Sequence, residues 1–312
     1  MPSFQARIFN PIVRLIVKRH SWGRDEFELA QRARRIFGTP KPFQWLATRS
    51  VNLSTIDDDG VSGEWLESKN HEPSAAILYI HGGGFVACSP ATHRPVTAAL
   101  ARMTHFPVFA PTYRLAPEHR FPAGLDDVCS AYHWLIRQFP SRNVVVAGDS
   151  AGGGLALSLM LRLRDEKVPM PVCAVCFSPW SDLTGSGASV RANAEKDAMF
   201  YAETEEQFAA AYISERSDLF SVSASPVFAE FNGVPPVLFQ VGSGEILVDD
   251  SRRIFDKIRA AGGTGELEIY DGVFHVWQMA IGLIPEARQS LESASRFIRQ
   301  HVASHADRPV SR

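Results

Sequence analysis

The 312-residue sequence has little cysteine and no surplus of charge of either sign. It contains four cysteines, and nothing in their spacing indicates a disulfide framework. The formal net charge at pH 7 is -2, so the molecule as a whole has no basic field that would attract nucleic acid or anionic lipid. These two shortages argue against a disulfide-stapled domain and against a nucleic-acid partner.

The closest pair of cysteines, Cys173 and Cys176, forms a C-x-x-C pattern inside the apolar run VCAVCF. No second pair of ligands accompanies it, as a four-ligand zinc site requires. We therefore expect buried structural thiols and no metal. The chain also lacks the glycine-rich patterns G-x-x-x-x-G-K and G-x-G-x-x-G, which argues against a nucleotide cofactor.

The sequence lacks an apolar run long enough to span a bilayer and a recognisable secretory signal, so stable membrane insertion is not expected. The N-terminal stretch FNPIVRLIVKRH, residues 9–20, has the pattern of an amphipathic helix with basic residues on one side. We expect this helix to pack on the body of the protein, and docking to a lipid surface is the alternative. The expected location is the reducing cytoplasm.

What the sequence does have is a regular alternation of short apolar runs and helical patterns. Two polar–apolar alternations around the turn DDDG predict an antiparallel hairpin over about 44–66. Apolar runs predict strands at 75–80, 107–111, 144–148, 172–177, 236–242 and 267–270, and amphipathic patterns predict helices at 91–103, 124–138, 151–166, 250–261 and 285–301. This alternation indicates an α/β fold with a mostly parallel, doubly wound central sheet flanked by helices.

Two segments interrupt this rhythm, residues 1–42 and residues 184–219, and both read as helical. We expect them to form a small helical cap over the carboxyl ends of the strands, where sites collect in open α/β sheets. The remaining residues, 43–183 and 220–305, are expected to form the catalytic core.

The stretch GDSAG, from Gly148 to Gly152, lies between a predicted strand and a predicted helix. It matches G-x-S-x-G, in which the serine occupies a strained strand-to-helix turn with its hydroxyl exposed. Glycines flank the serine because a side chain at either position would collide with the turn. Ser150 is therefore the candidate nucleophile.

A serine hydroxyl needs donors for the oxyanion, a base, and an acid that orients the base. The stretch HGGG at 81–84 follows a predicted strand and offers backbone N–H groups that no side chain shields. We assign the oxyanion hole to the amides of Gly83, Gly84 and Ala151.

The base is expected late in the chain, because this arrangement orders its residues as serine, acid and histidine. Among the ten histidines, His275, His301 and His305 lie beyond the last predicted strand, and His275 alone of these lies in a loop rather than in a polar C-terminal tail. The acid should follow the strand that ends near residue 241. Glu245 is the first candidate there, and Asp249 remains the alternative, since Asp249 also suits the start of a helix.

Several large side chains near these positions are candidates for the wall of an apolar substrate pocket. Ordinary core packing is the competing interpretation for each of them. They are Phe85, Phe200, Tyr201, Phe274, Val276 and Trp277.

With these residues, the chain resembles the hormone-sensitive-lipase-like family of α/β-hydrolase esterases. The resemblance rests on HGGGF at 81–85, YRLAPEHRFPAGLDD at 113–127, GDSAGG at 148–153 and FHVW at 274–277. These motifs occur in the family's order and spacing, and the resemblance covers nearly the whole chain. It implies an α/β-hydrolase fold and hydrolysis of short- to medium-chain acyl esters without a metal or organic cofactor, and it is compatible with a homodimer.

One motif departs from the family pattern. The family's acid motif reads Asp-Pro-Leu-x-Asp, and the matching stretch here is EILVDD, so that Glu245 falls on the position of the catalytic aspartate. The resemblance also makes Arg114 and Glu118 organisers of the loops around the oxyanion hole, with a surface ion pair as the competing interpretation.

The sequence thus predicts a serine carboxylesterase that acts on a small-molecule ester through Ser150, His275 and Glu245. An amidase or a lactonase would use the same groups. Two alternatives belong to other classes of protein. One is a lipase that takes longer acyl chains at an interface, and the other is a non-catalytic small-molecule-binding protein on the same fold.

Overall fold

Eight strands form a single sheet in the computed structural model, which describes residues 1–18, 22–23, 25–71, 74–140 and 143–306. The strands are β1 (Val51–Asp58), β2 (Val61–Ser68), β3 (Ala76–Ile80), β4 (Val108–Pro111), β5 (Val144–Asp149), β6 (Cys173–Phe177), β7 (Val237–Gly242) and β8 (Gly265–Tyr270). Their order across the sheet is β1-β2-β4-β3-β5-β6-β7-β8. The pairs β1–β2 and β2–β4 are antiparallel, and every pair from β4 to β8 is parallel.

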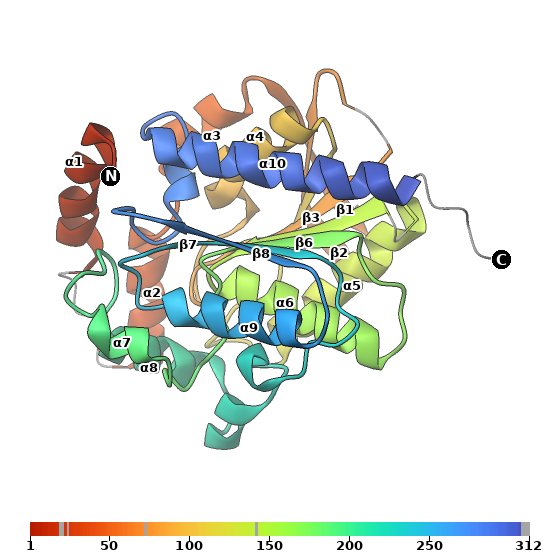
Figure 1. Cartoon of the computed structure of the whole chain (residues 1–312). Helices are drawn as coiled ribbons and strands as arrows, with labels where there is room; N and C mark the ends of the chain where they lie inside the picture. Colours follow the sequence, from red (N-terminus) through yellow and green to blue (C-terminus); the bar gives the residue numbers. More distant parts are fainter. Residues whose placement is uncertain (19–21, 24, 72–73, 141–142, 307–312) are drawn as a thin grey trace.

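Helices cover both faces of this sheet (Figure 1). One face carries α4 (Arg94–Thr104) and α10 (Pro285–Ala306). The other face carries α5 (Ala123–Gln138), α6 (Ala151–Asp165) and α9 (Val248–Ala260). A parallel sheet needs both layers, because its crossover connections place helices on each side.

Strand β3 shows how one apolar run supports two cores. Leu78 packs in the core under α5 and α6, and its neighbour Ile77 packs in the core under α4 and α10. Successive side chains of a strand point to opposite faces of the sheet. A run such as AILYI, buried throughout, is therefore the pattern of a central strand.

The remaining helices lie mostly in the two segments that interrupt the alternation. They are α1 (Phe4–Val13), a π-helical turn (Arg14–Lys18), α2 (Glu26–Ile36), α3 (Lys41–Thr48), α7 (Ala188–Ala192) and α8 (Ala202–Tyr212). Short 3-10 turns occur at Pro90–His93, Arg216–Phe220, Pro226–Phe228 and Trp277–Ala280. Residues 19–21 and 24 of the predicted cap segment 1–42 lie outside the described residues. The predicted helix 9–20 therefore lacks its last two residues, 19 and 20, in this description.

The N-terminal helices contact distant parts of the chain. The ring of Trp22 lies 5.3 Å from the ring of Phe208 in α8. Helix α1 is fixed to the body by hydrogen bonds from Ser3 Oγ to a carboxylate oxygen of Glu286 (2.8 Å) and from Asn10 Nδ2 to the carbonyl oxygen of Gly272 (2.8 Å). The predicted N-terminal helix thus packs on the body, and among the described residues no helix is both long and apolar enough to cross a membrane.

The sequence-based prediction of the fold is confirmed except at the start of the hairpin. We predicted extended structure from about residue 44, but residues 41–48 form α3 and the first strand begins at Val51. Pro42 stands in the first turn of α3, where the missing N–H of proline loses no helical hydrogen bond. The helix then packs against α4, and this tertiary contact overrides the short polar–apolar alternation.

The close packing of α6 on the loop after β6 can be tested at Gly154. A Cβ at this position would lie 2.1 Å from the carbonyl oxygen of Trp180. Alanine in place of a helical glycine ordinarily stabilises a protein by about 0.5–1 kcal/mol. Here we expect Gly154→Ala to lower the free energy of unfolding by about 1–3 kcal/mol in urea titrations, because the loop must move.

The control for this prediction is Ser130→Ala on the exposed side of α5. This substitution also raises helix propensity, and the smaller alanine side chain collides with no neighbouring atom. The free energy of unfolding should therefore change by less than about 0.5 kcal/mol. A gain in stability for Gly154→Ala would show that α6 does not approach the loop this closely.

Candidate active site

Ser150 sits in a sharp turn between β5 and α6. Its backbone has φ 52° and ψ -125°, a conformation that residues other than glycine rarely adopt and that costs of order 1–3 kcal/mol. The turn is possible because the residues two positions before and after the serine are glycines. A Cβ at Gly148 would lie 2.4 Å from the carbonyl oxygen of Gly152, and a Cβ at Gly152 would lie 2.1 Å from that of Ile80.

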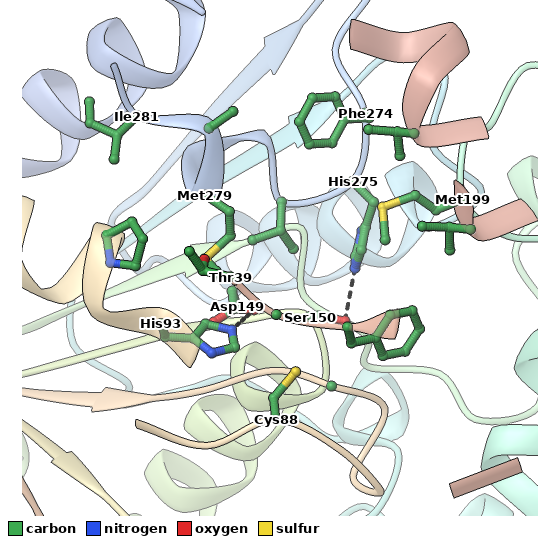
Figure 2. Close-up of a pocket in the computed structure, with 18 of the residues that line it drawn as sticks. Thr39, Cys88, His93, Asp149, Ser150, Met199, Phe274, His275, Met279 and Ile281 are labelled. Atoms are coloured by element: carbon green, nitrogen blue, oxygen red, sulfur yellow. Dashed lines mark hydrogen bonds and ion pairs between the residues drawn. The ribbon is translucent and has the colours of Figure 1, made fainter. Parts of the chain in front are cut away.

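His275 lies in the loop after β8, and its Nε2 is 2.8 Å from Ser150 Oγ (Figure 2). The imidazole is buried, and the ring of Phe200 packs against it edge-on at 5.2 Å. The following residue, Val276, has a φ of 53°, which is a genuine outlier for a β-branched side chain. The strained backbone and the aromatic contact together fix the ring with Nε2 toward the serine.

Glu245 lies just after β7 and holds the other side of the imidazole. Its Oε2 is 2.6 Å from His275 Nδ1. Its Oε1 accepts hydrogen bonds from the Ser178 hydroxyl (2.8 Å) and from the Gly242 amide (2.6 Å). Because the ionised carboxylate can only accept, Nδ1 carries the proton and Nε2 is left free to accept the proton of the serine hydroxyl.

The charges around His275 raise its pKa. Burial by itself lowers the pKa of this imidazole, but the negative charge of Glu245 and the hydrogen bond to it, together with the charges of Asp197 and Asp149, raise the pKa by more. The net shift is upward from the ordinary value of 6.5. A base with a raised pKa takes a proton more readily.

The alternative acid, Asp249, lies in the first turn of α9 and faces away from the imidazole. Its Oδ2 accepts a hydrogen bond from the Ser189 amide at 2.8 Å, and its Oδ1 pairs with Arg252 at 3.2 Å. The structure therefore brings Glu245, and not Asp249, into contact with His275.

The glycine-rich loop after β3 passes directly beside the serine. A Cβ at Gly82 would lie 2.9 Å from Ser150 Cβ. Gly83 and Gly84 have φ of 118° and 62°, and a Cβ at Gly84 would strike the ring of Phe208 at 2.3 Å. Within the described part of the chain, the amides of Gly83, Gly84 and Ala151 donate to no protein acceptor.

Asp149, the residue before the serine, joins this loop to the serine turn. Its Oδ1 accepts hydrogen bonds from the Tyr79 hydroxyl (2.7 Å) and from the Gly82 amide (3.1 Å). Its Oδ2 lies 3.2 Å from Nε2 of His93 (Figure 2). Burial raises the pKa of Asp149, but the interactions with His93 and the hydrogen bond from Tyr79 lower it by more, so that the pKa lies below its ordinary value and the group is an anion.

We did not predict roles for Asp149 and His93 from the sequence. The signal was present, because a carboxylate at the end of a wholly apolar strand must find buried donors. The variable position of G-x-S-x-G carries no such requirement in general, so the motif alone does not reveal it.

The loop that contains Arg114 and Glu118 is anchored by a residue from the N-terminal segment. Arg34 of α2 makes a two-pronged ion pair with Glu118 (2.8 and 2.7 Å) and donates to the carbonyl oxygen of Val86 (2.8 Å) in the glycine-rich loop. The side-chain hydrogen bond from Arg34 lowers the pKa of Glu118 to about 2. Arg114 instead pairs with Asp127 at 2.8 Å, so the two predicted organisers act with different partners.

A cavity of about 1160 Å³ opens in front of Ser150. Of the side chains that we expected in its wall, Phe200, Phe274 and Val276 line it. Much of the remaining wall is apolar and was not predicted. It includes Phe9, Val13, Phe37, Trp180, Met199, Phe208, Leu247 and Met279.

The other three candidates for the wall pack elsewhere. Phe85 is stacked on Tyr212, with ring centroids 3.8 Å apart. Tyr201 lies under the ammonium group of Lys18 at 3.9 Å. Trp277 is fully buried and donates through Nε1 to the carbonyl oxygen of Glu286. Proximity in the sequence to His275 or to the glycine-rich loop did not predict which side chains line the cavity, because neighbouring residues of a loop point in different directions.

Both cysteines of the C-x-x-C pattern, Cys173 and Cys176, are buried in β6 with free thiols. Burial raises the pKa of each thiol well above its ordinary value. Across the described residues, no group of three or more His, Cys, Asp or Glu side chains is arranged to hold a metal ion.

Comparison with known proteins agrees with this architecture. A family model described as an α/β-hydrolase fold matches residues 77–279. An acetyl-hydrolase of Streptomyces hygroscopicus is 36% identical over 239 residues, which are 76% of this chain and 79% of that protein.

Solved structures extend the similarity to almost the whole chain. The crystal structure of an esterase from the bacterial hormone-sensitive lipase family superposes with a TM-score of 0.88 at 31% identity, covering 97% of this chain and 99% of that one. The crystal structure of a protein called EstE5, soaked with p-nitrophenyl butyrate, superposes with a TM-score of 0.87 at 32% identity, covering 96% of this chain and 99% of that one.

The contact between His275 and Ser150 predicts a pH-dependent reactivity of the serine. A sulfonyl fluoride should label Ser150 only while His275 is neutral, so the labelling rate should rise with pH and reach half its maximum above 6.5, in line with the raised pKa. Glu245→Gln removes the charge that raises this pKa, so the midpoint should move to lower pH. Mass spectrometry of the labelled peptide gives the rate.

Asp249→Asn serves as the control in this experiment, since its carboxylate lies on Ser189 and Arg252 rather than on the imidazole. Its midpoint should equal that of the unmodified protein. A midpoint that moves with Asp249→Asn and not with Glu245→Gln would reverse the assignment of the partner of His275.

Proposed function

The chain belongs to the hormone-sensitive-lipase-like esterases of the α/β-hydrolase fold family, and we propose that it hydrolyses short- to medium-chain acyl esters with Ser150 as nucleophile, His275 as base and Glu245 as the acid that orients the base. It is a carboxylic ester hydrolase. The observation that carries the assignment of residues is the continuous line of contacts from Ser150 Oγ through His275 to Glu245, at 2.8 and 2.6 Å.

In the first half of the reaction, His275 Nε2 takes the proton of the Ser150 hydroxyl while Oγ attacks the ester carbonyl carbon. The negative charge that develops on the carbonyl oxygen is held by the free amides of Gly83, Gly84 and Ala151. Each such donor is worth roughly 3–4 kcal/mol of the barrier. The bond to the alcohol oxygen then breaks, the imidazolium gives its proton to that oxygen, and an acyl-serine remains.

In the second half, His275 takes a proton from a water molecule, whose oxygen attacks the acyl-serine carbonyl. The same amides hold the oxyanion. When the bond to Ser150 Oγ breaks, the imidazolium returns the proton to the serine and the carboxylic acid leaves. Glu245 stabilises the imidazolium in both halves and fixes its Nδ1–H tautomer.

The lining of the cavity supports an apolar acyl group, for which we propose a short to medium length. Its volume of about 1160 Å³ exceeds what an acetyl ester needs. Phe274 and Met199 bring apolar surface close to His275 (Figure 2), and the ring of Phe200 packs against the imidazole at 5.2 Å. The similar EstE5 structure soaked with p-nitrophenyl butyrate is consistent with this range. A non-catalytic binding protein would have no need of the strained Ser150 turn, which lowers stability.

We further propose that residues 1–42 and 184–219 form the cap of a catalytic core made of residues 43–183 and 220–305. The proposal draws support from Phe9 and Val13 in the first segment and Phe200 and Phe208 in the second, all of which line the cavity.

The homodimer and the cytoplasmic location also stay predictions. Sedimentation equilibrium measures the oligomeric state.

The assignment is tested by steady-state hydrolysis of p-nitrophenyl esters from acetate to palmitate. We expect kcat/KM to peak at short to medium chains, in line with the butyrate ester that was soaked into the similar EstE5 structure. Ser150→Ala should lower kcat about 10⁴–10⁶-fold, and Glu245→Gln about 10³–10⁴-fold through loss of the correct tautomer. Asp249→Asn, the matched carboxylate control, should keep kcat close to that of the unmodified enzyme. Full activity of Ser150→Ala would exclude this nucleophile.

Asp149 is expected to act as a positioning residue for the oxyanion hole, because it holds the Gly82 amide next to Gly83 and Gly84. Asp149→Ala should lower kcat about 10²-fold through a displaced loop, with little change in KM. Asp149→Asn should restore much of kcat, since its carbonyl oxygen can still accept from Gly82.

Tyr79→Phe is the control for this positioning role. It removes one donor to Asp149 but leaves the bond to Gly82, so it should lower the melting temperature while kcat stays within a few-fold of the unmodified enzyme. If kcat follows the loss of stability equally in Asp149→Ala and Tyr79→Phe, Asp149 has only a structural role.

A further inference from the structure

Helix α1 and the π-helical turn that follows it carry two apolar stripes, and only one of them faces the cavity. Phe9, Val13 and Val17 line the cavity. Figure 1 shows α1 at one end of the molecule, outside the helical layers on the sheet. The second stripe points to solvent, with exposed fractions from 44% to 75%. It consists of Phe4, Ile8, Ile12, Leu15 and Ile16.

Exposed apolar side chains also border the mouth of the cavity on α3 and on the loop before α10. Phe43, Leu46 and Leu283 both line the cavity and reach the solvent. Trp45 of α3 is 63% exposed. We call the exposed side chains of α1, the π-helical turn, α3 and Leu283 the mouth surface. Soluble proteins seldom leave a large apolar patch open unless it meets a partner.

The charge on the mouth surface has one sign. Residues 4–18 and 41–49 contain no aspartate or glutamate. Arg14 pairs with Glu195 from a neighbouring loop, and Lys18 is buried. Within the described part of the chain, the other cations of these segments are exposed and form no ion pair. They are Arg7, Lys41 and Arg49.

We propose that the mouth surface docks the protein on an anionic lipid surface, so that the cavity opens toward the layer from which an apolar ester enters. Helices with large apolar side chains and only basic charges lie in the plane of such interfaces, and stable binding takes both contributions. No described helix can span the membrane, which agrees with docking in the plane. The role of the cavity rests on the proposed function, whereas docking itself needs no catalysis.

A second copy of the chain fits this surface less well. A symmetric contact would place the same patch on both partners and bring Arg7, Lys41 and Arg49 of two copies together without a carboxylate from residues 4–18 or 41–49 to pair with them. An anionic surface removes this repulsion. The charge therefore favours the lipid over the dimer.

The test uses the Ser150→Ala protein, which cannot consume lipid, in sedimentation with vesicles. We expect it to bind phosphatidylglycerol vesicles more tightly than phosphatidylcholine vesicles, and less tightly as salt is added. The double substitution Ile8→Glu and Ile12→Glu should weaken binding to phosphatidylglycerol at least about tenfold. Phe220→Glu, at a still more exposed apolar residue on a 3-10 turn outside the mouth surface, should leave binding unchanged.

A parallel measurement separates docking from catalysis and from misfolding. In the protein that keeps Ser150, hydrolysis of p-nitrophenyl butyrate in water should be the same with and without the two substitutions in α1, because neither side chain lines the cavity. Vesicle binding without any ester hydrolysis would refute the proposed function and keep the docking surface.

Two results would overturn the docking proposal. One is equal binding of the unmodified and doubly substituted proteins to phosphatidylglycerol. The other is a dimer at sedimentation equilibrium that Ile8→Glu and Ile12→Glu convert to a monomer, with no vesicle binding in either form, which would assign the surface to a second copy.

Discussion

The buried contact between Glu245 and His275 is the interaction on which the rest of the site depends. The imidazole has been taken out of water, which by itself disfavours its protonated form, and a reaction base must carry a proton for part of each cycle. The carboxylate reverses this effect and raises the pKa. It does so because Ser178 and Gly242 hold it in one orientation. Glutamate reaches the imidazole from the same loop in which the family pattern has the shorter aspartate.

A second buried carboxylate works on the opposite side of Ser150. Asp149 binds Gly82 and lies against His93, while Glu245 binds His275. One anion orients the groups that receive negative charge, and the other orients the group that receives the proton. Both are placed by strand ends of one parallel sheet, where loops from separate βα units converge. The fold therefore brings the groups that assist Ser150 together at one edge of the sheet.

The sequence predicted the parts of this site that short segments encode. Glycines at 148 and 152, the HGGG loop and His275 are local signals, because turn sterics and strand ends restrict which residues fit. The lining was predicted only in part: Phe200 lines the cavity, while its neighbour Tyr201 packs on Lys18. Side-chain direction in irregular segments is set by tertiary packing, which periodicity does not report. For the same reason α3 was mistaken for extended chain, and the anchoring of the Glu118 loop by Arg34 was not foreseen.

The proposed mechanism passes through an acyl-enzyme at Ser150, and rapid quenching detects this intermediate. The enzyme is mixed with p-nitrophenyl butyrate, quenched in acid during turnover, digested, and read by mass spectrometry. We expect a butyryl group on the peptide that carries Ser150, and this group should disappear when the substrate is exhausted. Turnover with no acyl group on that peptide, or with the group on another residue, would contradict it.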